Sequence, residues 1–236
     1  MNEIFKISRR YFLKLGISVG SGLILGFHFY PPGHSGEAHA EPPAPFAPNA
    51  FIRISTDDMV TIIVNKSEMG QGVYTSLPML IAEELECDWN KIRVESAPVD
   101  PAYNHTQWGP MQGTGGSSSV RSEWERFRKA GAAAREMLLA AAAATWNVDK
   151  AACYAEKGRV YHTNGKSLTF GQLARKAADM PVPKAVTLKD PSSFRIIGKP
   201  TKRLDTPEKT DGKAIFGIDV QVPGMLTASS SISTWA

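Results

Sequence analysis

The chain has 236 residues, of which 42% are apolar and 21% are charged, and these proportions are typical of a globular protein and exclude a disordered one. The formal net charge is only +4, and the first forty residues supply +2 of it through four basic and two acidic side chains. An excess this small does not favour nucleic acid as a partner. Cys87 and Cys153 have neither metal-ligand spacing nor a disulfide framework, so we expect two buried single thiols.

The N-terminus has the pattern of a twin-arginine export signal. Arg9 and Arg10 precede a glycine-interrupted apolar run over residues 15–29, and a polar stretch then ends at Ala38-His39-Ala40. Residues 1–40 are therefore predicted to be a signal peptide that is recognised by the twin-arginine translocase and cleaved after Ala40, which gives a periplasmic protein. The run is shorter than the roughly twenty apolar residues of a comfortable membrane span. An uncleaved signal that leaves the protein membrane-attached is the alternative.

The mature chain is predicted to begin with a linker and a hairpin. Residues 41–48 contain four prolines, which favour an extended linker, and the folded part should start near Asn49. Residues 51–54 and 59–64 are β-rich runs separated by a short polar connection, as in a hairpin. A glycine turn at residues 68–72 follows it. The apolar residues Leu77, Leu80, Ile81 and Leu85 then have helical spacing, and residues 92–94 form another short strand candidate.

A loop over residues 100–112 leads to the second glycine turn, at residues 113–119, and directly into the longest helix. The apolar positions of this helix alternate in steps of four and three along one side. The charged residues that crowd its other sides are expected to form a solvated face, with Glu125 and Lys129 paired at i, i+4. These charged residues are Glu123, Glu125, Arg126, Arg128 and Lys129.

The last third of the chain is predicted to contain a small hairpin over residues 153–156 and 159–162 and a helix over residues 170–180. Pro181 and Pro183 then indicate a domain boundary. Residues 194–198 and 214–220 are β-rich and are predicted to be strands at the beginning of a second domain. Residues 229–236 are polar and show no clear core face.

The two glycine turns are the candidate binding elements. Each turn leads into a helix, so exposed backbone N–H groups and a positive helix end recur at two places, as a large anionic cofactor requires. A purely structural turn is the alternative for either segment alone, but their joint occurrence, with an amide side chain and serines beside them, favours binding of an anion and a heterocycle. The candidate cofactor-binding residues are Gly70, Gln71, Gly72, Gly115, Gly116, Ser117, Ser118 and Ser119.

Other chemistries are disfavoured. The first turn lacks the third glycine of a dinucleotide fingerprint and a convincing parallel βαβ context. We expect Glu68 to be a turn or helix-end partner rather than a general base, and the isolated His105 and His162 to be surface or loop residues rather than metal ligands. Residues 117–119 do not form the Gly-x-Ser-x-Gly elbow of a serine hydrolase. No residue of the chain is assigned as catalytic or as a metal ligand.

Two ordered motifs extend this interpretation. Residues 67–85 (SEMGQGVYTSLPMLIAEEL) and residues 115–122 (GGSSSVRS) closely resemble the molybdenum-binding large subunit of isoquinoline 1-oxidoreductase-type enzymes, in the xanthine dehydrogenase and aldehyde oxidase family. The resemblance continues to Leu226. It implies an α+β fold, with a partial molybdopterin-binding domain over residues 49–186 and the start of a hammerhead-like domain over residues 187–236, indicated by the motifs at 211–214 and 223–226.

The resemblance also implies a cofactor and partners. The cofactor would be molybdenum-molybdopterin cytosine dinucleotide, bound partly by the eight candidate residues and partly by the missing C-terminal part of the subunit. Such enzymes oxidise aldehydes or N-heterocycles such as isoquinoline, and pass electrons to a small iron–sulfur subunit with 2Fe-2S clusters, from which a c-type cytochrome can accept them. In such enzymes the protein positions and polarises the reacting groups, while molybdenum performs the redox chemistry.

Relatives are much longer, and the segment that bears their catalytic glutamate would lie beyond Ala236. We therefore expect this chain to be a truncated N-terminal fragment that is inactive alone. A small exported module that binds a nucleotide or another anion without redox activity is the alternative.

Overall fold

The computed structural model describes residues 22–26 and 50–228. The twin-arginine pair, the cleavage site after Ala40, the proline-rich linker and the C-terminal residues 229–236 lie outside the described residues. The chain divides into two compact units, of which the first ends at Arg203 and the second begins at Leu204. Each unit is described by itself.

The central sheet of the first unit has the strand order β1-β2-β3-β4, with β1 at Gly22–Gly26, β2 at Ala50–Ser55, β3 at Val60–Val64 and β4 at Ile92–Ser96. The neighbours β1, β2 and β3 are antiparallel, whereas β4 runs parallel to β3. The predicted hairpin is therefore confirmed as β2 and β3. All five residues of β3 are buried, as expected of a central strand.

The helix α2 (Val73–Leu85) follows β3, and the short 3₁₀ helix η1 (Trp89–Lys91) then leads into β4, which is parallel to β3. These elements form a βαβ unit, so the expectation that the first glycine turn lacks a parallel βαβ context was wrong. The hydrophobic pattern identifies each element but does not show which strands pair. The turn consequently lies between the carboxyl end of a buried strand and the N-terminus of a helix, which is the usual position of an anion site.

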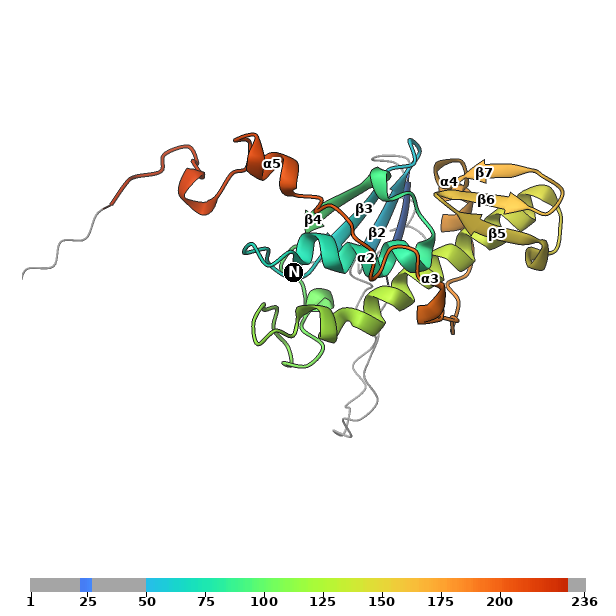
Figure 1. Cartoon of the computed structure of the whole chain (residues 1–236), viewed down its shortest axis with the longest axis horizontal. Helices are drawn as coiled ribbons and strands as arrows, with labels where there is room; N and C mark the ends of the chain where they lie inside the picture. Colours follow the sequence, from blue (N-terminus) through green and yellow to red (C-terminus); the bar gives the residue numbers. More distant parts are fainter. Residues whose placement is uncertain (1–21, 27–49, 229–236) are drawn as a thin grey trace, which may run out of the picture. The chain divides into compact units, whose positions relative to one another are not determined.

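The long helix α3 (Ser119–Trp146) packs closely along α2 (Figure 1). The contact depends on Gly131, where an added Cβ would lie 2.5 Å from the carbonyl oxygen of Ile81. The ring of Phe127 on the same helix is 5.0 Å from that of Phe51 on β2, and both side chains are fully buried. The core therefore lies between the central sheet and the α2–α3 pair.

A second sheet follows α3, with strands β5 (Cys153–Glu156), β6 (Arg159–His162) and β7 (Ser167–Thr169). The 3₁₀ helices η2 (Pro101–Tyr103) and η3 (Lys150–Ala152) precede α3 and β5 respectively. Helix α4 (Phe170–Ala178) begins with a capping box between Thr169 and Gln172. The predicted hairpin over residues 153–162 and the helix after it are confirmed. Both cysteines are free and buried, as expected.

Residues 194–198 and 214–220 are not strands, so this prediction was wrong. Residues 187–203 belong to the first unit and include the 3₁₀ helix η4 (Pro191–Ser193). The second unit contains the short helix α5 (Thr206–Thr210) and the 3₁₀ helix η5 (Gly217–Asp219). A β-rich run becomes a strand only where a partner strand is available, and Ile218 and Leu226 are instead 94% and 90% exposed. None of the helices within residues 50–228 is both long and apolar enough to cross a membrane.

Candidate cofactor site at the two glycine turns

The first turn is closed by the side chain of Glu68. One oxygen of this carboxylate accepts hydrogen bonds from the N–H groups of Gly70 and Gly72 at 2.8 and 2.9 Å, and the other accepts one from the N–H of Tyr74 at 3.0 Å. The negative charge thus lies at the N-terminus of α2, where the helix dipole favours it. The prediction that Glu68 is a turn and helix-end partner is confirmed.

Gln71 also bonds within this turn. Its side-chain oxygen accepts from the N–H of Met69 at 2.5 Å, and its side-chain nitrogen donates to the carbonyl of Ser67 at 2.8 Å. The N–H groups expected to bind an anion therefore already donate to side chains of the chain itself. An anion can reach the N–H groups of Gly70 and Gly72 only if the carboxylate of Glu68 moves away.

The second turn differs from the first in the hydrogen bonds of its N–H groups. Gly116 and Ser117 adopt left-handed conformations with φ of 57° and 51°. The N–H groups of Gly115, Gly116 and Ser117 donate no hydrogen bond to any residue that the structure describes. A serine in the left-handed region is strained, and such strain is typical of functional sites. Helix α3 starts two residues later, at Ser119, so its positive end adds to the attraction for an anion.

The indole of Trp108 covers the second turn. An added Cβ would lie 2.9 Å from this ring at Gly113 and 3.2 Å from it at Gly115, so two of the glycines are required by the close approach of the tryptophan. The ring also stacks on the imidazole of His105, with centroids 4.0 Å apart and planes inclined by 5°. Packing against Trp108 is thus a structural reason for part of the glycine pattern that sequence reasoning attributed to a cofactor.

His105 is a loop residue, as predicted, but it is buried rather than on the surface. Its Nδ1 accepts from the N–H of Gln107 at 3.0 Å, and its Nε2 lies 2.8 Å from the hydroxyl of Ser118, which donates to the carbonyl of Gly115. Because Nδ1 and the serine oxygen both act as acceptors, the imidazole is neutral with its proton on Nε2. Burial lowers the pKa of His105, and the cation of Lys66 lowers it further.

A buried ionic cluster lies behind the second turn. The Nζ of Lys66 is 3.4 Å from Oε1 of Glu123 and 3.3 Å from the carbonyl oxygen of Gly113, and the Nε of Arg126 is 2.6 Å from Oε2 of Glu123. Both charged groups of the Lys66–Glu123 pair are completely buried. Burial lowers the pKa of Lys66, although the carboxylate of Glu123 opposes this. Two cations surround one carboxylate here, so the cluster has a formal charge of +1.

This cluster also contains an unsatisfied polar atom. Asn65 donates to the carbonyl of Tyr103 at 3.0 Å and to Glu123 at 3.2 Å, but its buried side-chain oxygen accepts no hydrogen bond within the described residues. The expectation of a solvated charged face was therefore wrong for Glu123, because its partners come from β3 and from the residues after it. It is correct for Glu125, which is exposed and pairs with the half-buried Lys129.

The two turns meet through their flanking residues. The N–H of Ser67 donates to the hydroxyl of Thr114 at 2.8 Å, and Lys66, one residue earlier, bonds to Gly113. The second turn fits the negatively charged part of a dinucleotide, because it offers a helix N-terminus, a buried positive charge and N–H groups that have no acceptor among the described residues. The first turn fits such a group only after Glu68 has been displaced.

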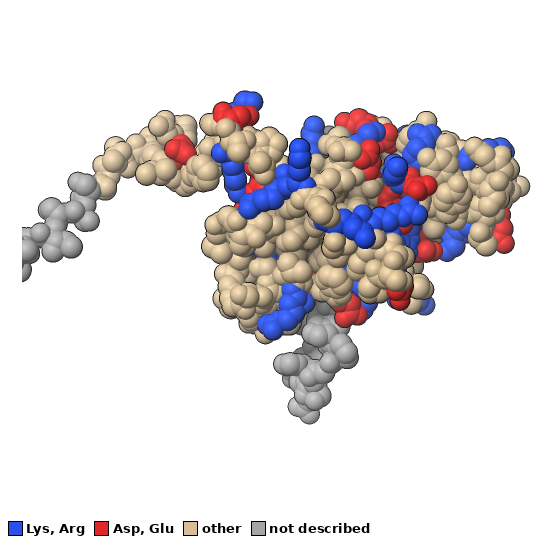
Figure 2. All heavy atoms as spheres, viewed as in Figure 1, with Lys and Arg blue, Asp and Glu red and all other residues tan. Residues whose placement is uncertain are grey.

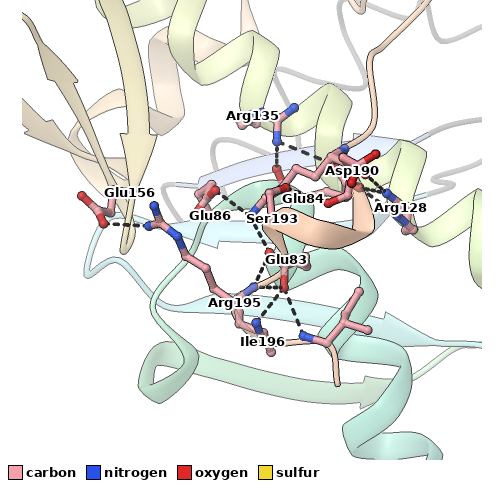
Figure 3. Close-up of polar contacts among 12 residues, drawn as sticks. Glu83, Glu84, Glu86, Arg128, Arg135, Glu156, Asp190, Ser193, Arg195 and Ile196 are labelled. Carbon is pink, nitrogen blue, oxygen red and sulfur yellow. Dashed lines mark hydrogen bonds and ion pairs between the residues drawn. The ribbon is translucent and has the colours of Figure 1, made fainter. Parts of the chain in front are cut away.

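A second ionic cluster fastens the connecting segment, residues 187–197, to α2 (Figure 3). The carboxylate of Glu83 accepts hydrogen bonds from the N–H groups of Arg195, Ile196 and Ile197 at 2.7–3.1 Å, and it also pairs with the ammonium group of Lys189. Burial by itself raises the pKa of Glu83, but these hydrogen bonds outweigh it and lower the pKa below its usual value.

Glu84, the next residue, anchors the same segment from the other side. It pairs with Arg128 at 2.7 Å and with Arg135 at 3.6 Å and accepts from the N–H of Lys189. Arg128 is therefore buried, not solvated as expected. Sequence reasoning missed this cluster, and its only signal was the pair of adjacent carboxylates on the predicted helix. On the face drawn in Figure 2, basic side chains lie beside acidic ones.

The sequence matches the molybdopterin cofactor-binding domain family over residues 7–222, and the chain belongs to this family. It is 33% identical over 264 residues to the beta chain of isoquinoline 1-oxidoreductase from Brevundimonas diminuta, an alignment that covers 96% of this chain and 33% of that protein. It is 35% identical over 237 residues to a membrane-bound aldehyde dehydrogenase (pyrroloquinoline-quinone) of Gluconacetobacter polyoxogenes, covering 95% of this chain and 29% of that protein.

The chain thus spans about a third of the length of these two relatives. Among solved structures, it is similar to quinoline 2-oxidoreductase from Pseudomonas putida 86, with 19% identity and a TM-score of 0.42 over 52% of this chain and 15% of that chain. This similarity is too low to establish a shared fold. The molybdopterin-binding family, together with the mixed helix and strand content of the first unit, supports the predicted α+β molybdenum-binding domain.

Proposed function

We propose that the chain is the N-terminal part of a molybdenum hydroxylase large subunit that oxidises aldehydes or N-heterocycles such as isoquinoline, and that it supplies part of the cofactor site. The observation that carries this proposal is the junction of the two turns in a member of the molybdopterin-binding family. At this junction, the N–H groups of Gly115, Gly116 and Ser117 have no acceptor within the described residues, and they follow Gly113, whose carbonyl oxygen accepts from the buried ammonium group of Lys66.

The proposed cofactor is molybdenum-molybdopterin cytosine dinucleotide. Its pyrophosphate would be bound by the N–H groups of Gly115 to Ser117 and by the start of α3 at Ser119, while Ser118 keeps the turn in place through Gly115 and His105. Gly70, Gln71 and Gly72 would contact the cofactor after Glu68 releases their turn. When bound, the metal supplies the redox chemistry. The residues of this chain bind and orient the cofactor, and none of them is assigned a catalytic role.

The wider organisation is part of the same proposal. The hammerhead-like domain would begin in the region after residue 187, and the rest of the large subunit would complete the cofactor site. A small iron–sulfur subunit would accept the electrons and pass them to a c-type cytochrome. The named relatives support an assembly of several subunits, since the Brevundimonas diminuta protein is one such component and a nicotinate dehydrogenase component of Pseudomonas putida is 30% identical over 178 residues. The twin-arginine motif at Arg9 and Arg10 would direct this assembly to the periplasm, whether or not the signal is cleaved.

Cofactor analysis tests the proposal. The chain is co-expressed with the products of its neighbouring genes and purified, and molybdenum is measured by mass spectrometry together with the cytidine monophosphate released by acid hydrolysis. We expect both in equal amounts. A preparation with nucleotide but without molybdenum would support the small anion-binding module instead. Pyrroloquinoline quinone in place of the pterin would also contradict the proposal.

A pair of glycine variants tests whether a bound cofactor is held by the second turn. Gly116 and Gly165 both have positive φ and no backbone close to the position of a Cβ, but Gly165 lies in the turn between β6 and β7. Gly116→Ala should therefore lower the molybdenum and nucleotide content, whereas Gly165→Ala, which introduces the same kind of backbone strain, should leave both unchanged. Equal losses in the two variants would show a general effect on folding rather than a site.

A further inference from the structure

Strand β1 comes from a segment to which sequence reasoning gave a different role. Gly22–Gly26 lies inside the apolar run of the predicted export signal, yet it pairs with β2 along its whole length. The register runs antiparallel from Gly22 opposite Ser55, through Ile24 opposite Arg53, to Gly26 opposite Ala50, with an irregularity before Gly26. The strand is drawn in blue at the edge of the sheet in Figure 1.

The strand that β1 covers is poorly suited to be a sheet edge. Phe51, Ile52 and Ile54 of β2 are completely buried, so both faces of this strand belong to the core. Without β1, the outer N–H and C=O groups of β2 would lose their partners. An apolar edge strand with unpaired backbone groups is a site of aggregation, and proteins normally cover or charge such edges.

Helix α4 also depends on β1. Phe170, Leu173, Ala174 and Ala177 form its buried face, and the helix packs beside both β1 and β2. Helix α3 contacts β1 as well. Loss of β1 would therefore open one side of the apolar layer between the sheet and α4, in addition to removing a ladder of backbone hydrogen bonds.

The family comparison includes the same segment. The match to the molybdopterin cofactor-binding domain begins at residue 7, and the alignment with the Brevundimonas diminuta protein covers 96% of this chain. Residues 22–26 therefore lie inside the region that the family match covers.

We propose that residues 22–26 are a permanent strand of the folded domain, and that the folded chain keeps them instead of losing residues 1–40 by cleavage after Ala40. The same residues cannot both be removed and complete the sheet. Retention follows from the pairing of β1 with β2 and from the packing of α4, and it does not depend on the identity of the cofactor.

Two measurements on the full chain test this proposal. The N-terminus of the folded protein isolated from its native host is determined by intact mass spectrometry, and we expect a chain that retains residues 22–26. Hydrogen exchange of β2 is then compared in Leu23→Pro and Ile24→Pro. Two variants are needed because only one of two adjacent residues on an antiparallel edge strand donates its N–H to the partner strand, and proline removes that N–H. At least one proline variant should exchange the amides of residues 51–54 tenfold or more faster, while Leu23→Val and Ile24→Val should behave like the natural chain.

Cysteine pairing provides a readout if the proline variants fail to fold. Ile24→Cys combined with Arg53→Cys places two thiols at directly opposite positions, which suits a disulfide, whereas Ile24→Cys combined with Glu95→Cys places the second thiol on β4, at the far edge of the sheet. Only the first pair should cross-link under mild oxidation. Any of three results would overturn the proposal. The first is a native N-terminus at Glu41. The second is unchanged hydrogen exchange in folded Leu23→Pro and Ile24→Pro, and the third is no cross-link in the first cysteine pair.

Discussion

The backbone N–H of Ser67 donates a 2.8 Å hydrogen bond to the hydroxyl of Thr114, and this bond joins the two glycine turns although these residues are 47 positions apart in sequence. The turns nevertheless differ in whether their backbone amides already have an acceptor. Glu68 occupies the amides of the first turn, while the amides of Gly116 and Ser117 in the second turn have no partner within the described residues. The amides of the second turn are thus open to a further acceptor, whereas those of the first turn are occupied by the chain itself.

The packing of α3 on α2 should be sensitive to a single methyl group. In Gly131→Ala the new Cβ would lie 2.5 Å from the carbonyl oxygen of Ile81, so the helices must separate. We expect the free energy of unfolding to fall by about 1–3 kcal/mol, as for other overpacked cores. Urea denaturation measures this. Gly217→Ala, which meets no atom within 4 Å, is the control, and an equal effect of both substitutions would contradict the packing argument.

The connecting segment should be released when its carboxylate anchor is removed. Glu83→Ala leaves the backbone N–H groups of Arg195, Ile196 and Ile197 without their acceptor, while the ammonium group of Lys189 keeps its ion pair with Glu86 at 2.8 Å. Leaving such donors without an acceptor should lower the free energy of unfolding by about 1–3 kcal/mol. Limited trypsin digestion should then cleave at Lys189 and Arg195 much faster than in the natural chain. Glu125→Ala removes a carboxylate that is 70% exposed and should change stability by less than about 0.5 kcal/mol.

The stability of the chain should depend on pH through His105. Burial, followed by the charge of Lys66, lowers the pKa of His105 in the folded state, with Arg126 and Arg121 acting in the same direction and Glu123 against it. The unfolded chain takes up this proton below about pH 6.5, whereas the folded chain does so only at lower pH. The contribution of His105 is therefore complete above about pH 6.5 and is lost as the pH falls toward the lowered pKa.

Denaturation of the natural chain and of His105→Gln at a series of pH values on both sides of the unfolded-state pKa measures this dependence. The difference in free energy of unfolding between the two proteins should shrink as the pH decreases. Parallel profiles would show that His105 does not take up its proton differently in the two states.

The chain alone should not catalyse the proposed reaction. We expect no dehydrogenation of aldehydes or N-heterocycles with an artificial electron acceptor, because the chain spans only about a third of the length of the two relatives on which the proposed activity rests. Exposed apolar residues of the second unit, such as Ile215, Ile218 and Leu226, should instead bind a dye such as ANS. Robust turnover by the purified chain would contradict the view that it is one part of a larger catalytic protein.

The elements that the sequence predicts well are those in which local spacing is sufficient. The helical spacing of Leu77, Leu80, Ile81 and Leu85 leads to α2, and all four side chains are buried. The pattern around Lys157 and Gly158 gives the β5–β6 hairpin, since both residues adopt the positive φ that a tight turn requires. In these cases the residues that determine the structure lie within one or two turns of one another.

Long-range partners could not be predicted in the same way. Glu84 pairs with Arg128, which is 44 positions away in the sequence, and Lys66 pairs with Glu123 on another element. Charged residues of the predicted helices therefore form buried ion pairs instead of a solvated face. At the site, residue types correctly indicated a role for Glu68 in its turn, but not that its carboxylate would occupy the amides proposed for the cofactor. The β-rich run at residues 194–198 was wrongly predicted to be a strand because its N–H groups bond to Glu83 instead of to a neighbouring strand.

The central claim is that the second glycine turn binds the anionic part of a nucleotide cofactor. Titration of cytidine diphosphate into the isotope-labelled full chain, followed amide by amide in NMR spectra, tests it most directly. We expect saturable shifts at the amides of Gly115, Gly116, Ser117 and Ser119, and a much weaker response at Gly70 and Gly72 while Glu68 holds their turn. Shifts that are absent from residues 115–119, or that are equally large at a remote turn such as Gly165, would contradict the account.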